Sequence, residues 1–387
     1  MRILMIATDF PYLKTGNWER ETIIQGGGSA CIAQMVEGLL KKGIEVAVVT
    51  RSEHDRASEF FDIPIYRTKF LYLGFRESKI THALFSLPAA IKMARQFKPD
   101  IIHSHNPPAA LTAIACAKIF RKPHVMTMHG PWSEVRIKGL KKAIAEKIEK
   151  FALKHADAVT CDSFALAKQL RQKYGIKTAG IQNAVDKNYY SRIKKMSARK
   201  KLGLRTKDKI VLFTGRFVAE KGLDSLLAAA TRVLQKNKNV RFLLIGGGFD
   251  EKPVHNWLKE NRKYKAGIIT IPFLKHEMMK YAYSAADVFV LPSLAEGLSR
   301  SLMEAMLFGL PCVATAVGGN IELLEGKRGV LVAPKDAHAL AVAIERSLYN
   351  KDIKNIAKDA RKYVINNLTV EKRIRKFIEV YKRLLKA

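Results

Sequence analysis

The sequence of 387 residues has no long apolar run and few cysteines. No stretch of about 18 apolar residues occurs, so we expect no transmembrane helix. The apolar start of the chain ends after residue 7, which is too early for a signal peptide. The four cysteines are Cys31, Cys116, Cys161 and Cys312, and they form neither a CxxC pair nor a metal-ligand pattern. We therefore expect a reducing, cytoplasmic location.

Acidic residues are scarce, with 35 Asp plus Glu against 68 Lys plus Arg and a formal net charge of +33. Such a positive field attracts anionic partners. Nucleic acid, an anionic membrane surface and a phosphate-bearing substrate all fit, and charge alone does not choose among them. A nucleic-acid-binding protein is disfavoured because no recognised binding module is present.

Apolar, β-branched segments alternate with amphipathic segments, which is typical of parallel strands joined by helices. The length exceeds that of one hydrophobic core, so we expect two successive doubly wound α/β domains. The predicted strands are 3–7, 46–50, 101–104, 124–128 and 158–161 in the first half, and 210–214, 241–245, 268–271, 288–291, 312–315 and 329–332 in the second.

The strand signal lapses over residues 186–208, where Lys and Arg crowd the stretch 191–201. We place the first domain at 1–185, a linker near 183–190 and the second domain at 190–368. Residues 369–387 contain a helix with one apolar stripe, which we expect to pack on the protein's own surface. Contact of this helix with a membrane is the alternative.

A glycine cluster, Gly26 to Gly28, precedes an amphipathic segment at 31–42. Glycines let backbone amides approach a ligand closely, and the N-terminus of the following helix favours an anion such as phosphate. The dinucleotide fingerprint is not complete, so a plain flexible loop also accounts for the cluster.

Two cations follow the predicted strand 210–214, in the segment Gly215–Gly222. Arg216 and Lys221 lie five positions apart at a strand–loop–helix junction, where they can clamp a diphosphate. The alternative is a pair of solvated cations that bind Glu220.

Two carboxylates, Glu296 and Glu304, follow the predicted strand 288–291. Both can face a ligand at the start of the next helix, and carboxylates accept hydrogen bonds from paired sugar hydroxyls. For Glu304 the alternative is a capping box with Ser301, which needs no ligand.

Histidines stand at the ends of two predicted strands. His129 follows strand 124–128 beside a turn, where it can donate a hydrogen bond or move a proton. A structural role for this lone histidine is the alternative. His103 and His105 can share one strand face, but no third ligand lies nearby in sequence, so we expect no metal site.

Taken together, these motifs resemble the retaining glycosyltransferases of family 4. The similarity covers nearly the whole chain and is strongest over 210–324, with the run EGLSRSLMEAMLFGLPCVATAVGGN at its centre. Supporting matches are the segments 100–105, 183–186 and 243–248. The resemblance implies a GT-B fold, in which two Rossmann-like, doubly wound parallel-sheet domains face each other across a cleft. It also implies that the C-terminal helix, 369–387, packs back on the first domain.

The resemblance also implies roles for individual residues. Arg216 and Lys221 would hold the donor diphosphate, Glu304 the ribose and Glu296 the donor sugar, which His129 would reach from the first domain. Further donor-binding residues would be Gly27, Gly28, Gly215, Gly297, Leu298, Ser299, Arg300 and Ser301. Fixed cations and a helix N-terminus would stabilise the leaving diphosphate in place of a metal ion, and no Asp-x-Asp metal motif occurs.

We therefore expect transfer of a hexose or related sugar from a UDP- or GDP-sugar to a lipid-linked, saccharide or phosphorylated acceptor, with no cofactor. A sugar-nucleotide epimerase of the same architecture is the alternative. Two features depart from the family pattern: Ala184 replaces a usual glycine, and 12–25 forms a long loop where acceptors bind. Attachment to the inner face of the cell membrane through the segment 70–76 or the helix 136–154 would explain the charge. A basic face that is only solvated is the alternative.

Overall fold

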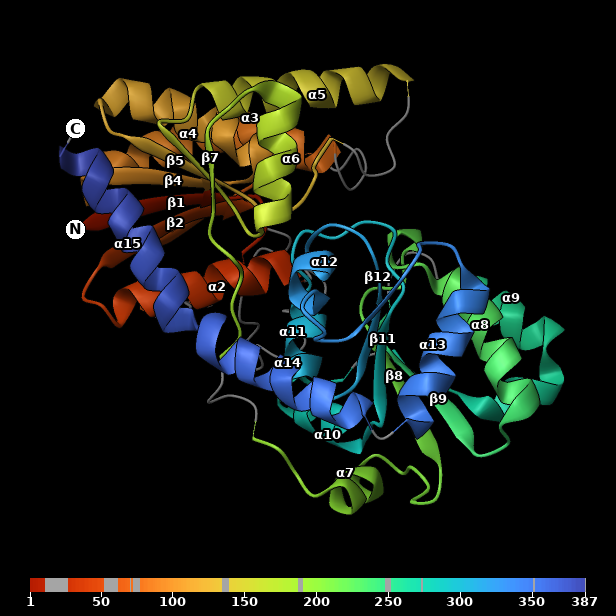
Figure 1. The fold of residues 1–387 in the computed structure, drawn as a ribbon. Coiled ribbons are helices and arrows are strands. Elements are labelled where there is room, and N and C mark those ends of the chain that lie inside the picture. Colours follow the sequence, from red (N-terminus) through yellow and green to blue (C-terminus); the bar gives the residue numbers. More distant parts are fainter. Residues whose placement is uncertain are drawn as a thin grey trace. The chain divides into compact units, whose positions relative to one another are not determined.

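The computed structural model describes residues 1–10, 27–51, 62–69, 71, 77–133, 139–186, 191–247, 252–272, 274–350 and 352–386. The chain forms two compact units, Met1–Asn183 with Val370–Ala387, and Ala184–Thr369. The domain boundaries predicted at 185 and 190 differ from this division by a few residues. Figure 1 shows the elements of each unit.

The first unit contains a parallel sheet of seven strands in the order β3-β2-β1-β4-β5-β6-β7. Chain order reverses between the neighbouring strands β1 and β4, as in a doubly wound fold. Two strands, β3 and β7, were not predicted. The strands are β1 (Arg2–Ala7), β2 (Glu45–Arg51), β3 (Ile65–Thr68), β4 (Ile101–His105), β5 (His124–Met128), β6 (Ala158–Cys161) and β7 (Thr178–Gly180).

Helices cover both faces of this sheet because successive side chains of each strand point to opposite faces. Ile3 and Met5 pack with one group of helices, and Leu4 with the other. The first group is α2 (Gly27–Leu40) and α15 (Val370–Lys386); the second includes α3 (Glu77–Phe97) and α4 (Asn106–Phe120). The remaining helices are α5 (Gly139–Lys154) and α6 (Phe164–Tyr174).

The C-terminal helix α15 joins the first unit, as predicted. Ile374, Phe377 and Tyr381 on its apolar stripe are fully buried in the core that α2 and β1 share. The stripe is therefore covered by protein, and the alternative that it contacts a membrane is wrong. Among the described residues, no helix is both long and apolar enough to span a bilayer.

The second unit contains six parallel strands in the order β10-β9-β8-β11-β12-β13. Its strands are nearly all apolar, as expected of a sheet buried on both faces. They are β8 (Lys209–Thr214), β9 (Val240–Ile245), β10 (Ile268–Ile271), β11 (Val288–Leu291), β12 (Cys312–Thr315) and β13 (Val330–Val332).

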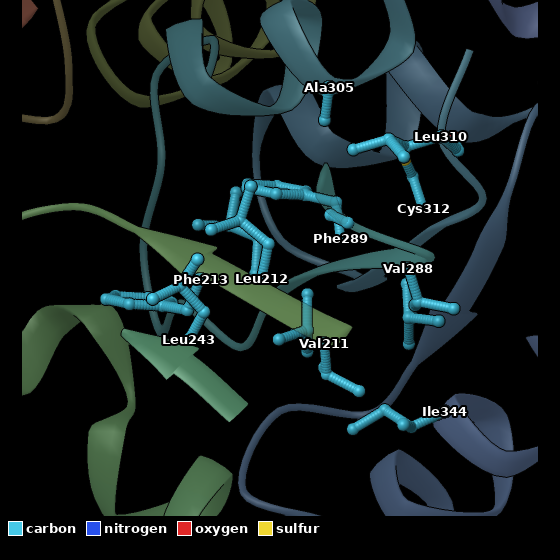
Figure 2. Packing of buried hydrophobic residues seen from close by; sticks show 14 of the residues in the cluster. Val211, Leu212, Phe213, Leu243, Val288, Phe289, Ala305, Leu310, Cys312 and Ile344 are labelled. Carbon is cyan, nitrogen blue, oxygen red and sulfur yellow. The ribbon is translucent and has the colours of Figure 1, made fainter. Parts of the chain in front are cut away.

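The core of the second unit is formed by these strands and the helices that flank them. Figure 2 shows Val211 and Phe213 of β8, Val288 and Phe289 of β11 and Ile344 of α13 within one cluster of buried side chains. The helices are α7 (Lys195–Lys201), α8 (Leu223–Lys236), α9 (Lys252–Glu260), α10 (Met279–Ala285), α11 (Arg300–Leu307), α12 (Gly319–Leu324), α13 (Ala337–Tyr349) and α14 (Ile353–Asn367), with 3-10 turns at Ala219–Lys221, Arg262–Gly267 and His276–Met278.

Candidate active site

The strand order of the second sheet locates its ligand site. Chain order reverses between β8 and β11, and ligands of such sheets bind beyond the carboxyl ends of the strands at this switch point. The segment 215–222 follows β8, and the segment 292–299 follows β11. The motifs predicted to hold a diphosphate and a sugar therefore meet at one end of one sheet.

Close backbone contacts fix these two loops against each other. The amide of Leu294 donates to the carbonyl of Glu220 at 2.7 Å. Gly222 has a φ of +66°, and a Cβ at this position would lie 2.0 Å from the carbonyl oxygen of Pro292. Glycine is needed here for both reasons, since other residues are strained at this φ and would clash. Lys221 is thereby held beside the loop that carries Glu296.

Lys221 pairs with Glu296. The Nζ of Lys221 donates to Oε1 of Glu296 at 2.5 Å, and the hydroxyl of Ser293 donates to the same oxygen at 2.7 Å. The side chains are 20% and 9% exposed. The alternative in which Lys221 pairs with Glu220 is therefore wrong. The side chain of Arg216 is exposed at the end of β8.

Helix α11 begins at the far end of the β11 loop. Ser299 is its N-cap, and the Ser299 hydroxyl accepts a hydrogen bond from the amide of Leu302 at 3.3 Å. The alternative reading of Ser301 and Glu304 as a capping box is wrong, because the helix starts two residues earlier than that motif requires. The N-terminus of α11, where a helix favours an anion, thus opens at the switch point.

Glu304 is held by two neighbours on the first turns of α11 and on α10. Tyr283 donates from its hydroxyl to Oε2 at 2.8 Å, and Nε of Arg300 donates to Oε1 at 3.2 Å. The hydroxyl of Tyr283 also lies 3.2 Å from that of Thr214. The Glu304 carboxylate is therefore oriented by contacts that sequence reasoning missed, since Tyr283 carries no motif.

A second glycine contact secures the turn between Glu296 and Ser299. The amide of Gly319 donates to the carbonyl of Gly297 at 2.9 Å, and a Cβ at Gly319 would lie 2.1 Å from that oxygen. Leu298 is buried beside it, and Ser301 lies 3.2 Å from Ser299 between their hydroxyl oxygens. The structure thus gathers the predicted donor-binding residues of the second unit: Gly215, Arg216, Lys221, Glu296, Gly297, Leu298, Ser299, Arg300, Ser301 and Glu304.

The predicted glycines of the first unit open helix α2. Gly27 is its first residue, and a Cβ at Gly28 would meet none of the described residues within 4 Å. A helix N-terminus favours an anion. Gly26 and the long loop 12–25 lie outside the described residues.

His129 lies at the carboxyl end of β5 and is nearly buried. Its Nδ1 donates to Oδ2 of Asp162 at 2.6 Å, and its Nε2 lies 3.0 Å from Nδ1 of His105. Nη2 of Arg373 donates to the other oxygen of Asp162 at 2.9 Å. Burial alone would raise the pKa of Asp162, but His129 and Arg373 outweigh it and lower that pKa below its ordinary value.

Sequence reasoning missed Asp162 and Arg373. The position of Asp162 in the sequence could have identified it, because Asp162 directly follows strand β6 just as His129 follows β5. Nothing in the sequence distinguishes Arg373 from the other cations on α15.

His103 and His105 do share a strand face, with ring centroids 4.5 Å apart. His103 is engaged by the hydroxyls of Tyr381 and Thr127, at 2.6 and 2.7 Å. In the part of the chain that the structure describes, no three His, Cys, Asp or Glu side chains form a group that could hold a metal ion.

Two family models match consecutive parts of the chain. The model described as Glycosyltransferase Family 4 matches residues 25–189, and the model described as Glycosyl transferases group 1 matches residues 194–367. The chain is a glycosyltransferase of family 4. The resemblance inferred from the motifs is thereby confirmed, as is the expectation that the protein is an enzyme.

This glycosyltransferase is similar to curated proteins along most of its length. It is 26% identical to an uncharacterized glycosyltransferase of Methanocaldococcus jannaschii, over 94% of this chain and 96% of that protein. It is 27% identical to the UDP-Gal:alpha-D-GlcNAc-diphosphoundecaprenol alpha-1,3-galactosyltransferase of Escherichia coli, over 76% of this chain and 78% of that enzyme.

Among solved structures, HepE of Anabaena in complex with UDP-glucose superposes with a TM-score of 0.78 at 20% identity, over 99% of this chain and all 100% of that chain. The two parallel-sheet units of the glycosyltransferase thus have the GT-B type of fold that was predicted.

Proposed function

We propose that this glycosyltransferase transfers a hexose or related sugar from a UDP- or GDP-sugar to a lipid-linked or saccharide acceptor, with retention of anomeric configuration and without a metal ion. The observation that carries the donor assignment is the meeting of Lys221, Glu296 and the N-terminus of α11 at one switch point. The similar HepE binds UDP-glucose, and the similar E. coli enzyme is named for UDP-Gal, which supports a nucleotide-sugar donor.

In the proposed reaction the bond between the anomeric carbon and the diphosphate oxygen breaks, and the diphosphate takes the electron pair. The acceptor oxygen bonds to the anomeric carbon, and its proton passes to an oxygen of the departing diphosphate. Negative charge grows on the diphosphate during this step, so Arg216, Lys221 and the amides at the start of α11 stabilise the transition state more than the bound donor. No metal is required for this role.

The carboxylates of the site recognise hydroxyl groups in this scheme. Glu304, oriented by Tyr283 and Arg300, accepts from the ribose hydroxyls of the donor. Glu296 accepts from hydroxyls of the donor sugar, and His129 hydrogen-bonds to the same sugar. Gly27 and Gly28 lie against the phosphates.

A donor panel tests the proposal. The purified enzyme is incubated with UDP- and GDP-sugars, first alone for thermal stabilisation and then with lipid-linked and free saccharide acceptors for product. We expect one donor to raise the melting temperature, since a ligand that binds only the folded state stabilises it. Release of a free epimerised sugar without acceptor, or no response to any nucleotide sugar, would contradict the proposal.

We further propose that the enzyme works at an anionic membrane surface, where lipid-linked acceptors lie. Helix α5 carries exposed Leu140, Ile144 and Phe151, whose exposed fractions are 78%, 46% and 44%. Exposed lysines surround this stripe: Lys141, Lys142, Lys147, Lys150 and Lys154. An apolar stripe flanked by lysines fits the interface of an anionic bilayer. The predicted contact at 70–76 and the start of the helix at 136–138 lie outside the described residues.

Cosedimentation with vesicles tests this second proposal. We expect binding to vesicles that contain phosphatidylserine and not to neutral ones, and a loss of roughly 30-fold for Lys147→Glu with Lys150→Glu, from about 1 kcal/mol per lysine. The matched control is Lys358→Glu with Lys362→Glu on α14, which changes the net charge equally. Equal loss in both double variants would reduce the effect to net charge and contradict a role for α5.

A further inference from the structure

A chain of hydrogen-bonded charged and polar groups runs from the C-terminal helix through His129 to His105. Arg373 of α15, Asp162 after β6, His129 after β5 and His105 at the end of β4 are joined in that order by hydrogen bonds of 2.9, 2.6 and 3.0 Å. The side chains of Arg373 and Asp162 are 2% and 4% exposed. Water therefore cannot substitute for either partner, and each link depends on the next.

The chain fixes where the protons lie. Asp162 is held ionised by Arg373 and His129, so both of its oxygens are acceptors and Nδ1 of His129 must carry the proton. Burial, together with His103, His129 and Arg373, lowers the pKa of His105 well below its ordinary value, so this ring is neutral. The 3.0 Å contact between Nε2 of His129 and Nδ1 of His105 needs one donor, and the position of the His105 proton decides which ring supplies it.

The surroundings of Nε2, the second ring nitrogen of His105, show which nitrogen of that ring carries the proton. Nε2 of His105 is buried and has no hydrogen-bond partner among the described residues. A proton on that nitrogen would be an unpaired buried N–H, which is the costlier arrangement. His105 therefore keeps its proton on Nδ1, directed at His129.

We propose that Asp162, anchored by Arg373, is a positioning residue that holds His129 in the tautomer protonated on Nδ1, so that Nε2 serves as a hydrogen-bond acceptor. In the structure the N–H of His105 occupies that acceptor. A substrate group that takes this place must itself be a donor, and a sugar hydroxyl has that chemistry. The inference rests on the proposed function for the identity of the substrate, while the tautomer can be tested without it.

The variant Asp162→Asn should reverse the tautomer of His129, and this reversal can be measured. Arg373 has only N–H groups to offer, so it selects the amide oxygen of Asn and directs the amide NH₂ at Nδ1 of His129. Nδ1 then becomes an acceptor, and the proton moves to Nε2. The ring nitrogens of histidine differ strongly in ¹⁵N chemical shift between protonated and bare forms, which allows the tautomer to be assigned in labelled protein.

Tyr381→Phe is the matched control. Tyr381 lies on α15, the helix that carries Arg373, and is as deeply buried as Asp162. Its hydroxyl bonds to His103 and not to Asp162. Its loss disturbs the same core without changing the partner of His129.

We expect wild type and Tyr381→Phe to show His129 protonated on Nδ1, and Asp162→Asn to show it protonated on Nε2. We also expect kcat to fall about 10²- to 10⁴-fold in Asp162→Asn, as when an orienting carboxylate holds the wrong tautomer, with KM for the donor nearly unchanged. A wild-type His129 protonated on Nε2 would overturn the inference whatever the variants do. Equal kcat in Asp162→Asn and Tyr381→Phe would also overturn the inference. If Lys221→Ala loses transfer in the same assay, the proposed function is still supported.

Discussion

Replacing Lys221 by alanine removes the ammonium group that we assign to the donor diphosphate. In the free enzyme this change breaks the 2.5 Å contact with Glu296 but leaves the carboxylate its bond from Ser293. Both side chains are partly exposed, so water can reach the remaining carboxylate. We therefore expect a modest stability loss of about 1–2 kcal/mol, which lowers the melting temperature by about 2–8 °C for a unit of this size.

The effect on turnover should be much larger. Truncating one partner of a desolvated charge pair costs about 2–5 kcal/mol, or roughly 30- to 5000-fold in kcat/KM. Lys221→Arg should recover part of this loss, because it keeps the charge but changes the geometry of its donors. The assay is transfer from the donor that the panel identifies, with melting curves on each variant.

The control for Lys221→Ala is Lys195→Ala. Lys195 pairs with Asp287 at 2.8 Å, just before β11 and thus at the opposite end of the same sheet. Its loss removes a comparable ion pair without touching the switch point, so we expect kcat/KM to stay within about twofold of wild type. If both variants kept wild-type kcat/KM, or both lost it equally, the assignment of Lys221 to the diphosphate would be refuted.

Three further outcomes are expected. Glu304→Gln should weaken donor binding roughly tenfold while largely sparing kcat, measured by calorimetry and initial rates, because the amide still accepts from Tyr283 but loses the charge; an unchanged Kd would contradict the ribose assignment. Treatment with EDTA should leave transfer unchanged, since cations of the protein meet the diphosphate charge, and restoration of a lost rate by Mg²⁺ would contradict this. Burial lowers the pKa of His124 to about 4 from 6.5, so the unfolded chain binds more protons as pH falls through this window. The free energy of unfolding should therefore decrease from pH 6.5 to pH 4, by up to about 3 kcal/mol from this residue, and urea titrations that show less decrease in His124→Gln would confirm the source.

The fold follows from apolar periodicity except at the edges of the first sheet. The two strands that were not predicted are β3, whose sequence IYRT is partly exposed, and β7, which has only three residues. Edge strands bury one side less completely, so their sequences lack the continuous apolar run that marks central strands. Whether such a segment forms a strand depends on its pairing with the neighbouring strand and not on its own composition.

The site could be predicted only as far as local motifs reach. Loops at strand ends are placed by strand order, which explains why residues 215–222 and 292–301 meet as expected. The partners of these residues are set by packing between distant segments: Ser293 and Tyr283 carry no motif, and Arg373 lies 211 positions from Asp162. The cap of α11 is a further case: Ser299 and not Ser301 caps the helix, and the turn before it is bonded through Gly297 to the distant Gly319.

The Arg373–Asp162 pair and the Lys221–Glu296 pair differ in burial, and this difference decides what each can do. Breaking a buried pair leaves an uncompensated charge at a cost of about 3–5 kcal/mol, so the pair of Arg373 with Asp162 is suited to hold a geometry and not to exchange partners. The Lys221 side chain is 20% exposed, so an anion that arrives from solvent can share or replace Glu296 as its partner. It follows that Glu296→Gln, which frees the ammonium group but keeps the bond from Ser293, should bind UDP at least as tightly as wild type while transferring sugar more slowly. Weaker UDP binding in this variant would mean that Glu296 positions Lys221 for the diphosphate and does not compete with it.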